Sequence, residues 1–285
     1  MEVNLRAGTP ADGERCGAIC YEAFRSIAEA HGFPPDFDSA ASAIKTVTRM
    51  LEASGFYGVV AEVDGEIAGS NFIDERGTII GLGPITVDPE GQNSGVGRLL
   101  MQHMLDRAEE KGCAGVRLFQ SAYHNRSLSL YAKLGFVARE PVSVMTGNPV
   151  GVEMPGYAVR PATEEDAEAC DAVCRGVHGH DRAGELRDAI RWGRPLLVEH
   201  EGRVTGYATT LGSAGHAVGE SNSEIKALIG AAKAYRGTGI IVPTRNADLF
   251  RWCLDQGLRI SFPGTMMSVG QYSEPRGGYL PSSLY

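Results

Sequence analysis

The feature that most constrains this chain of 285 residues is an internal repeat. Arg6 and Cys16, in the stretch LRAGTPADGERCGAIC, recur 154 positions later as Arg160 and Cys170, in the similar stretch VRPATEEDAEACDAVC. Each stretch predicts a short strand, a turn and a capped helix. A chain that carries the same unit twice is expected to fold as two similar domains in tandem.

Two further matches follow in the same order along the chain. Gly65 of VDGEIAG matches Gly202 of HEGRVTG at an offset of 137, and Gly135 matches Gly257 at an offset of 122. Because the offset falls from one match to the next, the second copy has lost segments since the duplication.

The stretch 147–156 contains two prolines and is typical of a linker. It divides the chain into expected domains at 1–148 and 157–285. Both lie within the range of roughly 100 to 200 residues that one hydrophobic core usually serves.

Strands alternate with helices in the first copy, which predicts an α/β layer structure. We expect strands at 2–6, 57–63, 66–74, 78–88 and 115–121, and helices at 11–30, 40–53, 95–111 and, as a short one, up to 134. The helix at 95–111 ends before Gly112, and its predicted buried face consists of Leu99, Met101, Met104, Leu105 and Ala108.

Composition excludes several classes of partner. The formal net charge of -8, from 27 Lys and Arg against 35 Asp and Glu, argues against binding to nucleic acid or to an anionic membrane. No stretch is apolar enough for a membrane span and the first residues lack a signal-peptide pattern, so a cytoplasmic protein is expected. The pairs Cys16/Cys20 and Cys170/Cys174 have helical spacing and are expected to be buried, with no metal site.

The stretch 84–100 predicts a strand end, a polar turn and the start of the helix at 95–111. Gly95 and Gly97 would let the backbone approach a ligand, and the unpaired amides of a first helical turn attract an anion such as a diphosphate. Tight packing of helix on sheet would also explain the glycines. A Walker loop and a dinucleotide fingerprint are excluded, because no Gly-Lys-Ser/Thr and no third glycine follow Gly97.

The same stretch resembles motif A of the GCN5-related N-acetyltransferases (GNAT), V-x-P-x-x-Q/R-x-x-G-x-G/A. Val87, Pro89, Gln92, Gly95 and Gly97 match it residue for residue. At 93, where many members carry glycine, this chain has asparagine, which also tolerates left-handed backbone angles.

A second segment, 124–136, resembles motif B of the family, which ends in LY-x-K-x-GF. The asparagine that usually lies seven residues before Tyr131 is replaced here by His124, and Asn125 follows one place late. Either residue could contact coenzyme A. Without the resemblance, Tyr131 is most simply a half-buried packing residue of a short helix.

The resemblance implies two tandem GNAT-like domains, each a mixed, mostly antiparallel twisted sheet flanked by helices. It implies an acyltransferase that moves an acetyl group from acetyl-CoA to a primary amine of a small molecule by direct attack, with Tyr131 protonating the thiolate and no metal required. The residues that the resemblance assigns to coenzyme A are Ile85, Thr86, Val87, Gln92, Asn93, Ser94, Gly95, Val96, Gly97, Arg98, Asn125, Ser127 and Tyr131.

The general base is not specified by the motifs. Many relatives carry a glutamate on the strand that here reads 78–83, and this stretch has no carboxylate. Candidates are Asp74 or Glu75 at the preceding strand end, His124, a water relay, or a group from the second half. Asp74 and Glu75 fit a solvated hairpin turn equally well.

The second copy lacks the phosphate loop. Between Gly206 and Gly257 there is no G-x-G, and Glu220 and Glu224 lie near the expected helix start, where negative charge opposes a diphosphate. We expect a degenerate domain that does not bind coenzyme A in the family's way and that shapes the acceptor pocket. The alternative function is a catalytically silent acyl-CoA-binding sensor or scaffold. The sequence is compatible with a homodimer and does not identify the acceptor amine.

Overall fold

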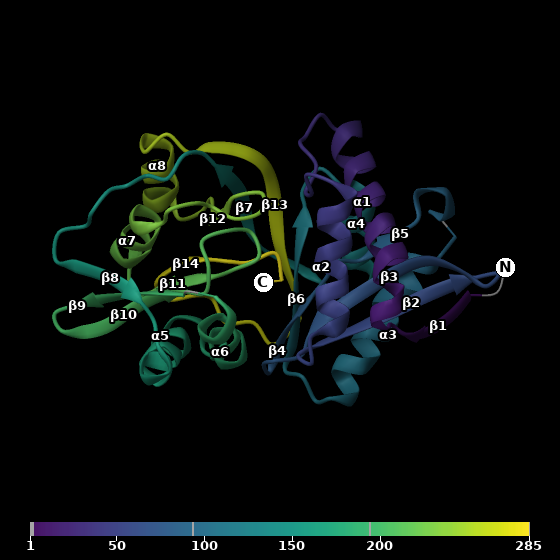
Figure 1. Cartoon of the computed structure of the whole chain (residues 1–285), viewed down its shortest axis with the longest axis horizontal. Coiled ribbons are helices and arrows are strands. Elements are labelled where there is room, and N and C mark those ends of the chain that lie inside the picture. Colours follow the sequence, from purple (N-terminus) through teal and green to yellow (C-terminus); the bar gives the residue numbers. More distant parts are fainter. Residues whose placement is uncertain (1–2, 93, 194, 285) are drawn as a thin grey trace. The chain divides into compact units, whose positions relative to one another are not determined.

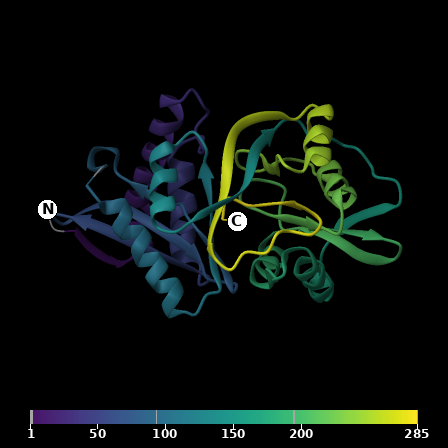
Figure 2. The ribbon, with the colours of Figure 1, turned by 180° about the vertical axis from the view of Figure 1, so that it is seen from behind.

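The computed structural model describes residues 3–92, 94–193 and 195–284. Figures 1 and 2 show helices packed on twisted sheets throughout this part of the chain. None of its helices is long and apolar enough to cross a membrane. The predicted α/β fold, with mixed and mostly antiparallel sheets flanked by helices, is confirmed.

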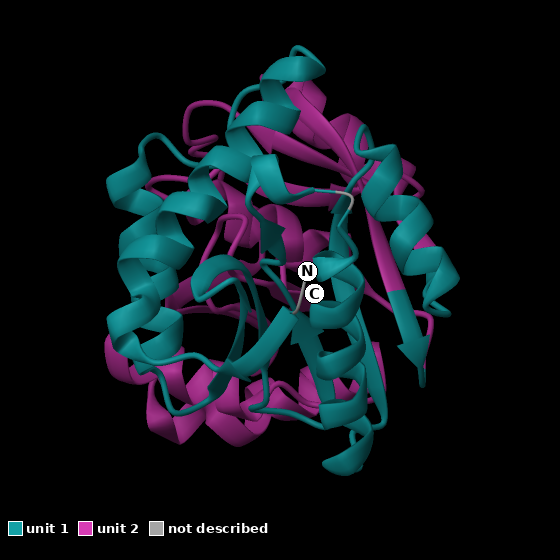
Figure 3. Ribbon diagram, turned by 90° about the vertical axis from the view of Figure 1, so that its right-hand side faces the viewer, with its two compact units in different colours: residues 1–137, 268–271 teal, residues 138–267, 272–285 magenta. Residues whose placement is uncertain are grey.

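The chain divides into two compact units, coloured separately in Figure 3. The first unit is Met1–Val137 together with Ser268–Gln271, and the second is Ala138–Met267 together with Tyr272–Tyr285. A four-residue segment from late in the chain therefore belongs to the first unit, where the Gln271 N–H donates to the Ala114 carbonyl at 2.8 Å. This division describes compactness. The functional domains expected at 1–148 and 157–285 stay a prediction.

The elements of the first unit follow the predicted order closely. Its helices are α1 (Gly13–Ala30), α2 (Ala40–Glu52), α3 (Val96–Glu110) and α4 (Asn125–Lys133), with short 3₁₀ turns at Pro10–Asp12 and Pro89–Gly91. Its strands are β1 (Val3–Ala7), β2 (Phe56–Val63), β3 (Glu66–Asp74), β4 (Ile79–Leu82), β5 (Thr86–Val87), β6 (Gly115–Ser121) and the start of β7 (Val137–Thr146).

The strand predicted at 78–88 is two strands in the structure. β4 pairs antiparallel with β3 and parallel with β6, whereas β5, in the described part of the chain, pairs with β3 alone. The separation falls at Gly83, whose φ of 135° suits only glycine, and at Pro84, which has no N–H to donate. A ladder cannot continue through these two residues.

Alternation along β3 places helices on both faces of the first sheet. Phe72 packs into the core cluster of α1 and α2 with Cys16 and Val47, while Asn71, pointing the other way, donates to the Leu100 carbonyl of α3 at 3.4 Å. The buried face of α3 consists of Val96, Leu100, Met101, Met104 and Ala108. Leu99, predicted to be buried, is 43% exposed, because Leu100 occupies the stripe that Met104 and Ala108 continue at helical spacing.

The second unit repeats this order, and its first three helices are shorter than their counterparts. Its helices are α5 (Ala167–His178), α6 (Ala183–Trp192), α7 (Asn222–Ala231) and α8 (Ala247–Asp255), with a 3₁₀ turn at Glu164–Asp166. Its strands are β8 (Tyr157–Pro161), β9 (Leu196–His200), β10 (Arg203–Ala208), β11 (Ala217–Gly219), β12 (Ile240–Pro243), β13 (Arg259–Gly270) and β14 (Gly278–Leu280). Five of these strands form an antiparallel sheet in the order β14-β11-β10-β9-β8, and β12 pairs antiparallel with β7.

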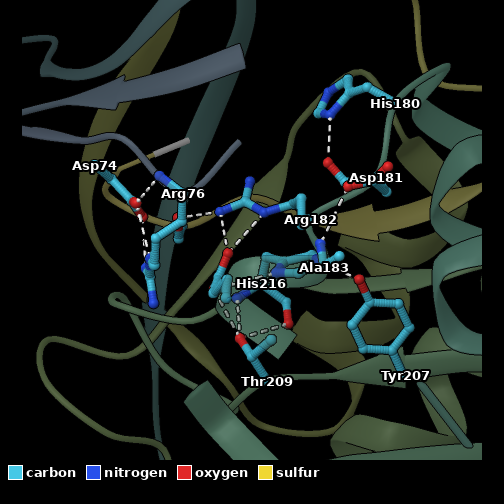
Figure 4. A network of polar contacts seen from close by, with 11 residues as sticks. Asp74, Arg76, His180, Asp181, Arg182, Ala183, Tyr207, Thr209 and His216 are labelled. Atoms are coloured by element: carbon cyan, nitrogen blue, oxygen red, sulfur yellow. Dashed lines mark hydrogen bonds and ion pairs between the residues drawn. The ribbon is translucent and has the colours of Figure 1, made fainter. Parts of the chain in front are cut away.

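A buried polar network lies within the second unit (Figure 4). Glu185 accepts from the Thr209 hydroxyl at 2.9 Å and lies 3.3 Å from His216 Nδ1, while His216 Nε2 is 3.1 Å from the Tyr207 hydroxyl. Tyr207 and His216 are almost completely buried. Each polar group of this network has a partner, so the network fixes the packing of α6 against β10 without an unpaired charge.

The structure confirms the duplication through a matching ion-pair network. Arg6 contacts Asp12 at 2.8 Å and Glu62 at 2.6 Å, and its counterpart Arg160 contacts Asp166 at 2.7 Å and Glu199 at 2.8 Å. In both copies the aspartate also caps the turn before the first helix. The network ties the first strand to the first helix and to the second strand. Cys16 and Cys20 in the first copy, and Cys170 and Cys174 in the second, are buried free thiols, as predicted.

We predict that Asp12→Ala lowers the free energy of unfolding by about 2 kcal/mol, because the nearly buried Arg6 contact and the cap are lost together. The hydrogen bond from Arg6 holds the pKa of Asp12 well below its usual range. Asp12 thus stabilises the fold above the pKa it has when unfolded, and the deficit of the variant shrinks as the pH falls below that value. Urea unfolding followed by circular dichroism measures both effects. Glu66→Ala, at an exposed carboxylate, is the control, and equal stability of the two variants would contradict the prediction.

Candidate functional site

The edge of β5 that faces away from β3 carries backbone amides with no ladder partner in the described part of the chain. The Asp88 N–H donates to the Ala68 carbonyl at 2.8 Å, and Ser70 lies opposite Thr86. Because N–H directions alternate along a strand, the amides of Ile85 and Val87 point away from β3. This edge can pair with an extended ligand as if the ligand were another strand.

The polar turn after β5 leads into the N-terminus of α3. Gly95 is the N-cap residue in the left-handed conformation, with φ of 90°, and no side chain caps the helix. The amides of Arg98 and Leu99 already donate to the Gly95 carbonyl, whereas those of Val96 and Gly97 have no acceptor among the described residues. Two amides without an acceptor among the described residues, at the positive end of a 15-residue helix, can form a site for an anion.

Gly97 distinguishes the two interpretations of the glycine pattern. A methyl group at its Cα would lie 3.6 Å from Val87 Cγ2 and 3.8 Å from Leu130 Cδ2, which are ordinary contact distances. Packing of helix on sheet therefore does not require glycine at this position. The glycine at this position is therefore consistent with close approach of a ligand to the backbone.

The remaining predicted residues of the turn border this space. Ser94 donates its hydroxyl to the Gly91 carbonyl at 2.5 Å, and Gln92 accepts from Arg126 of α4, also at 2.5 Å. Arg98 is exposed and has no ion-pair partner within the described ranges, so its charge is available to an anion. Thr86 is buried, and its backbone groups point toward β3 rather than toward the free edge. Asn93 lies outside the described residues.

Tyr131 lies on α4 with its ring buried, and the ring packs against Phe136 at a centroid distance of 6.0 Å. Burial raises the pKa of its phenol, which therefore stays protonated. Buried tyrosine hydroxyls usually have a hydrogen-bond partner, and this one has none in the described part of the chain. The hydroxyl is a proton donor without a protein acceptor.

His124 is the N-cap residue of α4, and Asn125 and Ser127 follow in its first turn. Burial, together with the nearby charges of Arg126 and His31, lowers the pKa of His124 to about 4, so its imidazole is neutral at pH 7. Ser127 donates to the His124 carbonyl at 2.9 Å and accepts from Gln120 at 3.2 Å. Asn125 is exposed at the helix start.

The structure does not bring Glu75 to the other predicted residues. Its carboxylate contacts Arg107 at 2.5 Å and Lys111 at 2.7 Å, at the C-terminal end of α3, roughly 16 Å along the helix from its N-terminus. Burial alone would raise the pKa of Glu75, but the hydrogen bonds from Arg107 and Lys111 lower it overall. Asp74 is likewise held by Arg76 at 2.5 Å (Figure 4). Neither carboxylate is placed to take a proton near β5.

A carboxylate that the sequence analysis missed lies in the loop between α1 and α2. Asp36 Oδ2 is buried and has no hydrogen-bond partner within the described ranges. Burial raises the pKa of Asp36 to about 6. No motif covers this loop, so only the three-dimensional surroundings single Asp36 out.

The corresponding place in the second unit is closed. The Glu224 carboxylate, almost fully buried, accepts from the Ser221 amide at 2.9 Å and from its hydroxyl at 2.7 Å at the start of α7. β11 lies opposite Gly206 as β5 lies opposite Gly69, so β11 corresponds to β5, and it pairs with the C-terminal strand β14. At the constant offset of 122, Tyr131 corresponds to Cys253, a buried thiol. An anion cradle, a free strand edge and a phenol are thus all missing at this place in the second copy.

The described residues contain no group of three or more His, Cys, Asp or Glu side chains placed to hold a metal ion. The His178 and His180 rings lie 5.8 Å apart, and His180 Nδ1 is 3.0 Å from the Asp181 carbonyl.

Comparison with known proteins agrees with this geometry. The sequence model of the acetyltransferase (GNAT) family matches residues 19–136. The [ribosomal protein bS18]-alanine N-acetyltransferase of Escherichia coli K12 is 40% identical over 52 residues, which is 18% of this chain and only 35% of that protein.

Two solved structures are similar over nearly the whole chain. A GCN5-related N-acetyltransferase from Sphaerobacter thermophilus has a TM-score of 0.62 at 16% identity, covering 95% of this chain and 96% of that one. A tandem GNAT protein from the clavulanic acid biosynthesis pathway has a TM-score of 0.57 at 11% identity, covering 96% and 100%. At these levels of sequence identity, the structural similarity supports the fold and nothing further.

We predict that the His124 imidazole titrates near pH 4. Because it is harder to protonate in the folded than in the unfolded chain, its contribution to stability is present above the unfolded pKa and is lost as the pH falls toward 4. An NMR titration of the histidine ring protons measures the value, with the exposed His31 as the internal comparison. An apparent pKa of His124 near the unperturbed 6.5 would contradict the buried placement.

Proposed function

This chain belongs to the GNAT acetyltransferase superfamily, and on that premise we propose that its first unit transfers an acetyl group from acetyl-CoA to a primary amine of a small molecule. The observation that carries the proposal is that the Val96 and Gly97 amides at the start of α3 have no acceptor among the described residues, at a position where packing does not require glycine. The two family motifs lie on the same unit. The second unit, closed at the corresponding place, is assigned no cofactor.

The residues present fit coenzyme A. Backbone amides of Val96 and Gly97, with the charge of Arg98, would hold the diphosphate, and the outward amides of Ile85 and Val87 would pair with the amide groups of the pantetheine arm. Gln92, Asn93, Ser94, Asn125 and Ser127 border the same region by sequence or by contact. When bound, acetyl-CoA supplies a thioester, whose carbonyl carbon is the electrophile.

Three groups of this chain would act on the reaction. An outward amide of β5 stabilises negative charge on the thioester oxygen, as an oxyanion donor does. The protonated, unpartnered phenol of Tyr131 supplies a proton to the departing thiolate. His124, neutral at pH 7, positions the start of α4 and is a weak proton acceptor, whereas Glu75 is omitted because its two cation partners hold it at the far end of α3.

The test is incubation of the purified chain with acetyl-CoA and a panel of alkylamines, diamines, amino acids and peptide amines, with thiol release as the readout. Transfer to at least one small amine is expected. Binding of acetyl-CoA without turnover on any amine would instead favour the silent acyl-CoA sensor. The bS18-related enzyme acts on a ribosomal protein, so transfer to peptide amines alone would replace the small-molecule acceptor by a protein one.

We predict that Gly97→Ala keeps the stability of the native chain but weakens coenzyme A binding by at least about tenfold, or about 1.4 kcal/mol. The added methyl group would make ordinary contacts with Val87 and Leu130, and we expect it to hinder the close approach of the diphosphate to the backbone of the first helical turn. Gly176→Ala, at an exposed position inside α5 with open space around it, is the matched control and should raise stability by up to about 1 kcal/mol without changing affinity. Calorimetric titration with coenzyme A measures both. Equal affinities of the two variants would remove the α3 N-terminus from the site.

We predict that Tyr131→Phe lowers kcat by about 100-fold or more while the affinity for acetyl-CoA stays within about twofold, because a proton donor is lost but the ring is kept. Tyr157→Phe, at a half-buried tyrosine of the second unit, should leave kcat unchanged. Single-turnover rates at saturating acetyl-CoA separate the two effects. Unchanged turnover of Tyr131→Phe would assign this residue to packing.

A further inference from the structure

The loop 31–39 between α1 and α2 contains a carboxylate that the proposed mechanism has not used. Asp36 Oδ2 is sealed from water and has no hydrogen-bond partner among the described residues, although the residue as a whole is only half-buried. A carboxylate oxygen that is buried without a hydrogen-bond donor or a cation beside it is unfavourable. The loop has neither helix nor strand, so a small displacement of it would expose this oxygen.

The surroundings of Asp36 are aromatic. The rings of Phe33 and Tyr123 stack at a centroid distance of 4.6 Å, and His31 packs against Tyr123 at 5.6 Å. Burial raises the pKa of Tyr123 to about 12, and the negative charge of Asp36 contributes to this increase. An unpaired carboxylate beside aromatic rings is the environment that selects an ammonium group, through a charged hydrogen bond and through the ring faces.

Asp36 is linked to the sheet beside β5 through residues of α1. α1 packs on β5, and its Cys16 lies against Ser70, the residue opposite Thr86. Cys20 follows Cys16 by one turn, about 6 Å along the helix. Besides burial, the charge of Asp36 raises the pKa of the Cys20 thiol. Asp36 is therefore an electrostatic neighbour of the part of α1 that packs on the β3–β5 pair, where the acetyl group is expected.

We propose that Asp36 Oδ2 binds the ammonium group of the acceptor and takes one of its protons, so that the acceptor is a small cationic alkylamine. This inference rests on the proposed acetyl transfer. It supplies the base that strand 78–83 lacks and that Glu75, held by Arg107 and Lys111, does not provide. The formal net charge of -8 favours the approach of such a cation over that of an anion.

The proton and electron pairs balance in this scheme. The ammonium gives one proton to the Asp36 carboxylate and becomes a neutral amine with a free electron pair. That pair forms the bond from nitrogen to the thioester carbon, and the bond from carbon to sulfur breaks with its electrons on sulfur. The thiolate takes the Tyr131 proton, and the second proton lost by the nitrogen restores the phenol. Asp36 then releases its proton to water.

The test compares two isomeric probes, benzylamine, which is an ammonium ion at neutral pH, and p-toluidine, which is not. In Asp36→Asn we expect the affinity for benzylamine, measured by calorimetry at pH 7.5, and its kcat/KM with acetyl-CoA to fall about tenfold to 100-fold. The same quantities for p-toluidine and the affinity for coenzyme A should stay within about twofold. Asp38→Asn, at the exposed carboxylate two residues on, is the control and should behave as the native chain.

Benzylamine binding to Asp36→Asn at native affinity would overturn the inference. Benzylamine binding that depends on Asp36 without any acetyl transfer would keep the ammonium site and reject the proposed function. A structural role is separated by thermal unfolding, because loss of an unpaired buried charge should leave the melting temperature unchanged or higher.

If Asp36→Asn does not fold, the pH dependence of benzylamine binding to the native chain tests the same inference. Protonation of Asp36 below about pH 6 removes the anion, so affinity should fall between pH 7.5 and 5. The titratable groups around this loop are Cys20 of α1, His31, Tyr123 and His124, and the His31→Gln variant, which cannot titrate there, should keep the same profile. A flat profile would overturn the inference.

Discussion

The interruption of one strand at Gly83 and Pro84 is the constraint on which the first unit depends. Up to Gly81 this strand pairs with β6, and beyond Pro84 it pairs with β3 alone. Two backbone requirements, a positive φ and a missing N–H, produce the separation. Within the described ranges the amides of Ile85 and Val87 have no ladder partners, and the turn after β5 leads into α3, whose first two amides have no acceptor among the same residues. The strand edge and the helix end form one site because they are consecutive in the chain.

The second copy shows what happens when the same scaffold loses these features. It keeps the ion-pair network of its first strand, as Arg160 repeats the contacts of Arg6 with an aspartate and a glutamate. Its strand edge is filled by β14, and its helix start is filled by Glu224. The interactions that maintain the fold are therefore separable from those that would hold a ligand. That separation is expected when one copy of a duplicated unit keeps only a structural or pocket-forming role.

Sequence patterns predicted the elements of the first unit to within a few residues, because helix caps, glycines and alternating apolar residues act locally. The same local reasoning placed Leu99 rather than Leu100 in the core, since a helix face is fixed only by what packs against it. Motif residues such as Gly97 and Tyr131 could be found because the backbone chemistry that they serve requires a fixed spacing. Asp36 could not be found, because its interest comes from an oxygen without a partner among the described residues and from Tyr123, 87 positions later. Glu75 was misleading because its partners Arg107 and Lys111 lie 32 and 36 positions later.

The central claim is that the chain grips a diphosphate with main-chain nitrogens of the first unit alone. The most direct measurement is a two-dimensional ¹H–¹⁵N NMR spectrum recorded with increasing coenzyme A. The account predicts that the amide signals of Val87, Val96 and Gly97 shift first and furthest, while those of 222–224 at the start of α7 stay in place. Shifts centred on the α7 residues, with the α3 start unaffected, would contradict it.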